Sequence, residues 1–136
     1  QVECSPGTFV FWDEGYATLF GEQKFQKAAV LMSRVISKIS PHIYCLDLGY
    51  KSVGSEFLLP RVTFLSPHQF TQTGHSEEHL VIESHTPEVL EIGQILLAHP
   101  YHICPTVALY EQVHVASMGR IIGQWEVIAR KRKITI

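Results

Sequence analysis

The chain has 136 residues, of which 46% are hydrophobic and 18% are charged, and its formal net charge is −2. This composition supports one folded domain and argues against intrinsic disorder. The slightly negative charge argues against binding nucleic acid through a broad basic surface. No run of about 18 apolar residues would place the chain in a membrane.

The predicted elements are short apolar runs separated by Gly and Pro. A turn at residues 6–8 precedes the apolar run 9–12. Residues 27–39 fit both a helical spacing and a period of two, and we interpret them as one long strand because strands surround them. Further short β-rich runs are found at residues 43–46, 61–65, 80–82, 95–97, 106–109 and 113–115, and a tight turn at 117–120 leads into 121–129.

Several short strands punctuated by Gly and Pro indicate an all-β, mainly antiparallel sandwich or barrel. The sequence shows no convincing amphipathic helix, no repeat and no linker, so residues 1–136 are expected to form a single β domain. The first residue is Gln, and no basic-then-apolar leader follows it. We therefore expect the domain to be part of a longer protein.

The sharpest chemical feature is the string HPYHICPT at residues 99–106, in which His102 and Cys104 are separated by one residue. On extended backbone, residues i and i+2 point to the same face, so imidazole and thiolate would converge on one ion. Nitrogen and sulfur ligands together suit Zn²⁺, with water or substrate completing an open site. The alternative is a buried cysteine beside a half-exposed histidine, with no metal.

A second polar cluster is Ser76-Glu77-Glu78-His79, in which a carboxylate could orient the imidazole for acid–base work. A solvated polar loop is the alternative. Lys51 follows a glycine turn, but no neighbour suggests the lowered pKa that a Schiff-base lysine needs. The odd number of cysteines gives no complete disulfide framework, so a reducing cytoplasm is the expected setting.

Five strings occur in an order that resembles the C-terminal domain of the D-threonine aldolase and D-serine dehydratase family, which comprises pyridoxal-phosphate enzymes related to alanine racemase. They are PGTFVF at 6–11 followed by Asp13, LDLGYK at 46–51, SEEH at 76–79, PYHICPT at 100–106, and WEV at 125–127 before Ala129-Arg130. The resemblance covers nearly the whole chain. No single string is specific, and the order of all five carries the resemblance.

The resemblance implies a Greek-key β-barrel like the C-terminal domain of alanine racemase, packed on an N-terminal (β/α)₈ barrel in a homodimeric lyase. It implies that His102 and Cys104 hold a divalent metal, Zn²⁺ rather than Mn²⁺ or Mg²⁺, which grips the β-hydroxyl of a D-3-hydroxy amino acid. Aldolase members tend to have a carboxylate at the position of Cys104, which favours the zinc-binding dehydratase branch at the metal site.

In the family, the lysine that binds pyridoxal phosphate lies in the missing barrel, so Lys51 is not assigned this role. The 136 residues alone should be inactive and should not bind the cofactor covalently; within them, only His79 is a possible catalytic residue. Two other functions stay open: a non-catalytic β-barrel binding module, and a metal-free amino-acid racemase domain, which His102 and Cys104 argue against.

Overall fold

The computed structural model describes residues 2–3, 7–131 and 133. Six strands form the main sheet: β1 (Leu31–Lys38), β2 (Ile43–Leu46), β3 (Val62–Phe64), β4 (Phe70–His75), β5 (Leu80–Ser84) and β6 (Ile95–Pro100). The remaining elements are η1 (Thr8–Val10), α1 (Glu14–Leu19), α2 (Ile103–Val107), β7 (Gln112–Ser117), β8 (Arg120–Glu126) and η2 (Ile128–Arg130). The chain is therefore mostly antiparallel β structure, as the sequence predicts.

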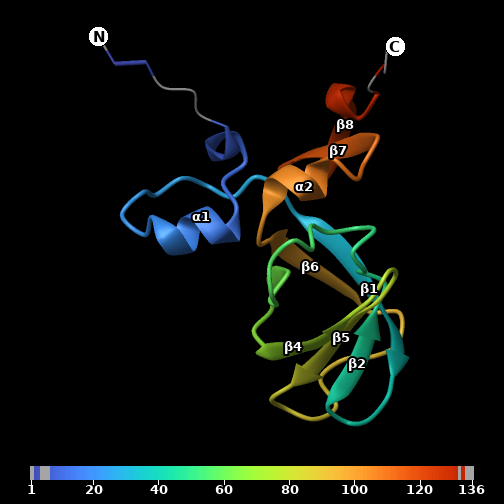
Figure 1. Ribbon diagram of the computed structural model, residues 1–136. Helices are drawn as coiled ribbons and strands as arrows, with labels where there is room; N and C mark the ends of the chain where they lie inside the picture. The colour runs from blue at the N-terminus through green and yellow to red at the C-terminus, as the bar shows by residue number, and fades with distance from the viewer. Residues whose placement is uncertain (1, 4–6, 132, 134–136) are drawn as a thin grey trace.

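The main sheet has the strand order β3-β6-β1-β2-β5-β4, and all its pairs are antiparallel. It curls into a nearly closed barrel in the lower part of Figure 1. Alternate residues point inward, as the period of two requires; in β5, for example, Leu80, Ile82 and Ser84 are buried. The core of the barrel consists of Val35, Tyr44, Leu46, Leu48, Val53, Val62, Leu80, Ile82, Leu90, Leu96 and Ala98.

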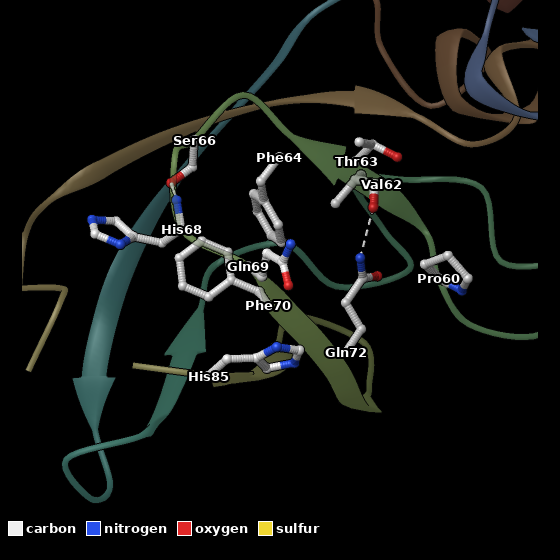
Figure 2. A pocket seen from close by; sticks show the side chains of 10 residues that line it. All are labelled: Pro60, Val62, Thr63, Phe64, Ser66, His68, Gln69, Phe70, Gln72 and His85. Carbon is white, nitrogen blue, oxygen red and sulfur yellow. Dashed lines mark hydrogen bonds between the residues drawn. The ribbon is translucent and has the colours of Figure 1, made fainter. Parts of the chain in front are cut away.

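The two end strands of the sheet, β3 and β4, are joined by a side chain rather than by a backbone ladder. The Gln72 amide on β4 accepts a hydrogen bond from the Arg61 backbone N–H at 2.7 Å and donates one to the Val62 carbonyl at 2.6 Å. Figure 2 shows the bond to Val62, with the rings of Phe64 and Phe70 beside it. These rings pack edge to face with centroids 5.4 Å apart. One side chain and one aromatic pair thus close the barrel.

Two regions lie outside the barrel in Figure 1: residues 7–28, which contain η1 and α1, and the hairpin of β7 and β8. Asp13 caps α1 by accepting a hydrogen bond from the Tyr16 N–H at 2.9 Å. The hairpin turns at Met118 and Gly119, which both have positive φ values, as a two-residue type I′ turn requires. The predicted turn at residues 117–120 is confirmed.

Most strand predictions are confirmed. Residues 27–39 do contain a strand, which is shorter than expected because it begins only at Leu31. The expected strand at residues 106–109 is wrong, because residues 103–107 form α2. The helices α1 and α2 have six and five residues, too few to show an amphipathic pattern in the sequence. β4 has no counterpart among the predictions, since its sequence FTQTGH carries a single large apolar residue. None of the helices in the described ranges is long and apolar enough to cross a bilayer.

Candidate functional site

The candidate metal residues lie at the turn that leads from β6 into α2. His102 is extended, with φ −131° and ψ 111°, whereas Cys104 belongs to α2. The prediction that both residues share one strand face is therefore wrong, because β6 ends at Pro100, before His102, and a helix begins between the two residues. The Thr106 hydroxyl stabilises the turn, since it donates to the His102 carbonyl at 2.6 Å and accepts from the Gly54 N–H at 3.0 Å.

The His102 imidazole is oriented by the loop that precedes β3. Its Nδ1 contacts the carboxylate of Glu56, and the Phe57 ring packs against it with centroids 5.5 Å apart. Because an ionised carboxylate only accepts hydrogen bonds, this contact would, in the neutral imidazole, place the proton on Nδ1 and leave the lone pair on Nε2. That is the usual arrangement of a metal-binding histidine, whose second nitrogen donates to a carboxylate.

Cys104 is the second candidate ligand. Its side chain is exposed, and its Sγ lies 3.1 Å from the hydroxyl of Thr8 in η1. Among the described residues, no three His, Cys, Asp or Glu side chains gather closely enough to hold a metal ion. Nitrogen and sulfur donors fit Zn²⁺, and the described chain would thus offer two ligands and leave coordination positions for water or substrate.

The SEEH string forms the connection between β4 and β5, and it faces Lys51. Lys51 Nζ lies 2.9 Å from Glu77 Oε2 and 2.6 Å from Glu78 Oε1, and these carboxylates raise the pKa of the lysine above its usual range. The loops fit closely, because a Cβ on Gly49 would lie 2.1 Å from the Glu77 carbonyl oxygen. A lysine paired in this way is protonated and does not act as a nucleophile.

His79 is exposed in the same connection, where its carbonyl accepts a hydrogen bond from the Ser76 N–H at 2.9 Å. Within the described residues, no hydrogen bond or ion pair joins its imidazole to Glu77 or to His102. Its catalytic role therefore stays a prediction.

A hollow of about 410 Å³ lies along the β3–β4 junction shown in Figure 2, and His68 and His85 are among its lining residues. None of the predicted site residues lines it. Its walls come from the strands that Gln72 joins, so the hollow belongs to the closure of the barrel.

Sequence reasoning missed the contacts that Glu56 and Thr8 make with His102 and Cys104, which lie 46 and 96 positions away from them. A contact between residues so far apart leaves no spacing pattern in the sequence. Asp13 was noted only as part of a string, and the structure buries its carboxylate beside the turn that carries His102.

Residues 28–116 match the family model described as "Putative serine dehydratase domain". The chain is 29% identical over 132 residues to a D-threonine aldolase from an Arthrobacter species, and this match covers 95% of the chain and 34% of the relative. The chain thus spans about a third of the length of this relative.

Among solved structures, the D-threonine aldolase of Filomicrobium marinum matches with a TM-score of 0.79 at 23% identity, over 92% of this chain and 35% of that one. A D-threo-3-hydroxyaspartate dehydratase matches as a cysteine-to-alanine variant in the metal-free form, with a TM-score of 0.64 at 19% identity, over 88% of this chain and 37% of that one. A dehydratase of the same name also matches as a histidine-to-alanine variant substituted two positions earlier, with a TM-score of 0.59 at 20% identity, over 74% of this chain and 31% of that one.

Proposed function

The chain belongs to the serine dehydratase domain family, and on this basis we propose that it is the C-terminal β domain of a pyridoxal-phosphate-dependent lyase. The proposed substrates are D-3-hydroxy amino acids, which are either dehydrated or cleaved. In this proposal, His102 and Cys104 bind a divalent metal that holds the substrate's β-hydroxyl. Zn²⁺ is proposed over Mn²⁺ and Mg²⁺ because a thiolate prefers a softer ion than either.

The observation that carries the proposal is the contact between His102 Nδ1 and Glu56, which leaves Nε2 available to a metal. The dehydratase variants support it, because a histidine and a cysteine two positions apart are the substituted residues there, and the structure of the cysteine variant is of its metal-free form. The same spacing separates His102 from Cys104. Two protein ligands leave positions at which a substrate hydroxyl could enter.

A metal in this position would act as a Lewis acid on the β-oxygen of the substrate, which eases loss of hydroxide or of the hydroxyl proton. Pyridoxal phosphate would supply the electron sink for the carbanion. Within this chain, the exposed thiol of Cys104 and the oriented imidazole of His102 would bind the metal and set its position. Lys51 takes no part in this scheme, because two carboxylates hold its ammonium group.

We also propose that a barrel domain carrying the cofactor lysine packs against this domain in a homodimer. The chain spans 34% of the length of its aldolase relative, which leaves room for such a domain. Large apolar side chains outside the barrel support this, since Leu19, Ile122 and Trp125 are 73%, 66% and 62% exposed. Exposed apolar surface on this scale is typical of a face that another domain covers.

The test uses the full-length protein that contains this chain, incubated with D-serine, D-threonine and D-threo-3-hydroxyaspartate. A dehydratase releases ammonia and a 2-oxo acid, whereas an aldolase releases glycine and an aldehyde. Zinc is measured in the same preparations by elemental analysis. Lyase activity that a chelator removes and Zn²⁺ restores is the expected result.

Cys104→Ser is the decisive variant, because it removes a soft ligand and little volume. Zinc affinity should fall by more than the roughly 10- to 100-fold that loss of an outer partner costs, and activity should fall with it. Cys45→Ser is the matched control, since Cys45 is half-buried in β2 and forms no part of the proposed site. A Cys104→Ser protein with full activity and no need for metal would contradict the proposal, as would racemisation without lyase products.

A further inference from the structure

Asp13 is a buried carboxylate whose two oxygens join two separate parts of the chain. Its side chain is buried, and the residue is only 2% exposed. Oδ1 accepts a hydrogen bond from the Tyr16 N–H at 2.9 Å, and Oδ2 accepts one from the Ile103 N–H at 2.8 Å. A buried carboxylate is costly unless hydrogen bonds satisfy it, so these two donors explain how Asp13 is tolerated there.

The second donor is the important one, because Ile103 is the residue between His102 and Cys104. Its N–H belongs to the first turn of α2, where backbone donors have no partner within the helix. A hydrogen bond to this amide fixes the peptide plane between His102 and Ile103, which is the first of the two peptide planes that separate the candidate ligands. The direction of both side chains relative to one another depends on that plane.

Two further contacts bring residues 7–20 against the same turn. The Gly15 N–H donates to the Tyr101 carbonyl at 2.9 Å, and Thr8 Oγ1 lies 3.1 Å from Cys104 Sγ. The approach at Gly15 is close, since a Cβ there would lie 2.9 Å from the Tyr101 oxygen. Contacts at 101, 103 and 104 therefore all come from one N-terminal segment.

We infer that Asp13 is a positioning residue for the metal pair, which it sets by fixing the Ile103 amide between His102 and Cys104. The inference rests on the proposed function, because it concerns the same metal. It adds that residues 7–20, although far from the ligands in sequence, form part of the site's framework. Asp13 itself is not proposed as a ligand, because it is buried and both its oxygens are already occupied by backbone hydrogen bonds.

The first test is Asp13→Asn in the full-length protein. An amide offers one acceptor oxygen, so its NH₂ group must face one of the two backbone donors. We expect zinc affinity, measured by competition with a chromophoric chelator, to fall about 10- to 100-fold, as for other outer partners of metal ligands. With Co²⁺ in place of Zn²⁺, the thiolate-to-metal charge-transfer band should weaken or shift, which a purely structural role would not require.

Asp47→Asn is the matched control, because the Asp47 carboxylate also accepts a backbone hydrogen bond, from the Arg34 N–H at 2.6 Å, but lies at the end of β2. It should leave zinc affinity and the cobalt spectrum unchanged. Circular dichroism at the working temperature shows whether each variant is folded.

Gly15→Ala keeps the test decisive if Asp13→Asn unfolds, and it changes no charge. Alanine favours α1 itself, but its Cβ would force the Tyr101 carbonyl away. We expect weaker zinc binding in a protein that stays folded. Wild-type zinc affinity in both folded variants, or in folded Gly15→Ala alone if Asp13→Asn unfolds, would overturn the positioning role and leave the proposed function standing. Failure of the wild-type protein to bind zinc would overturn both.

Discussion

The barrel and the β7–β8 hairpin contain similar apolar residues, but these are buried in the barrel and exposed in the hairpin. Val35, Leu46 and Ile82 in the barrel are 0% exposed, whereas Ile122 and Trp125 in the hairpin are 66% and 62% exposed. A two-stranded hairpin with nothing packed on it is at best marginally stable in water. The barrel therefore supplies its own core, whereas the hairpin leaves these apolar side chains exposed.

This difference is sharpest in a pair of leucine substitutions. Leu46→Ala should lower the free energy of unfolding by about 2–5 kcal/mol, because it leaves a cavity in the barrel core. Leu19→Ala in α1, which also lies outside the barrel, should change it by no more than about 0.5 kcal/mol in the isolated domain, because Leu19 is 73% exposed. Urea denaturation followed by circular dichroism measures both. Equal losses would show that the outer region carries a core of its own.

The next largest effect on the free energy of unfolding is expected at Gln72, which closes the barrel. Gln72→Ala should cost about 1–3 kcal/mol, since it leaves the half-buried Arg61 N–H and Val62 carbonyl without their partner. The matched control is Gln124→Ala in β8, where the amide contacts only the exposed His114 and should matter little. Denaturation midpoints at a common pH compare the two, and an unchanged Gln72→Ala midpoint would show that β3 and β4 hold together without the amide.

The interior of the barrel also contains a buried hydroxyl group whose removal should stabilise the fold. Ser33 in β1 is 4% exposed, and its Oγ makes no hydrogen bond to any described residue. Ser33→Ala should therefore raise the free energy of unfolding by about 1 kcal/mol. Ser37→Ala on the same strand is exposed and should leave it unchanged. A destabilised Ser33→Ala protein would mean that the hydroxyl is satisfied in solution.

The smallest expected effect is a pH dependence at the rim of the barrel. Burial and then the Arg61 guanidinium lower the pKa of His75 below its ordinary value. The unfolded chain therefore binds the proton more readily, and the stability from neutral His75 is complete above about pH 6.5 and falls as the pH decreases toward the folded pKa. His75→Gln should flatten this part of the curve of unfolding free energy against pH. A variant with the wild-type slope would assign the dependence to another histidine.

Much of the barrel could be predicted because the alternating pattern of a strand is visible within a few consecutive residues. Residues 43–46 form β2 at the expected positions. β4 was missed because its pairing with β5 places polar Thr and Gln in a strand that local propensity does not favour. The helix at residues 103–107 was missed because ICPTV looks β-rich and is too short to show a helical period.

The site was predictable only in part, and for a related reason. The spacing of His102 and Cys104 is visible in the sequence, but its interpretation on extended backbone was wrong. Their supports come from Glu56 and Asp13, which are distant along the chain, so only the fold brings them together. The resemblance to a family implied a metal-binding role for the pair, but it did not indicate which residues position the two side chains.

The turn that carries His102 and Cys104 begins at a strand paired on both edges and ends in a short helix. β6 pairs with β1 on one edge and with β3 on the other, and the pairing continues to the Tyr101 N–H. α2, by contrast, has five residues and is too short to persist without outside contacts. Amide hydrogen exchange should therefore change steeply across this turn, with β6 opening only when the barrel unfolds and α2 opening locally. His102 lies between the strand whose amides exchange only on unfolding and the helix whose amides exchange by local opening.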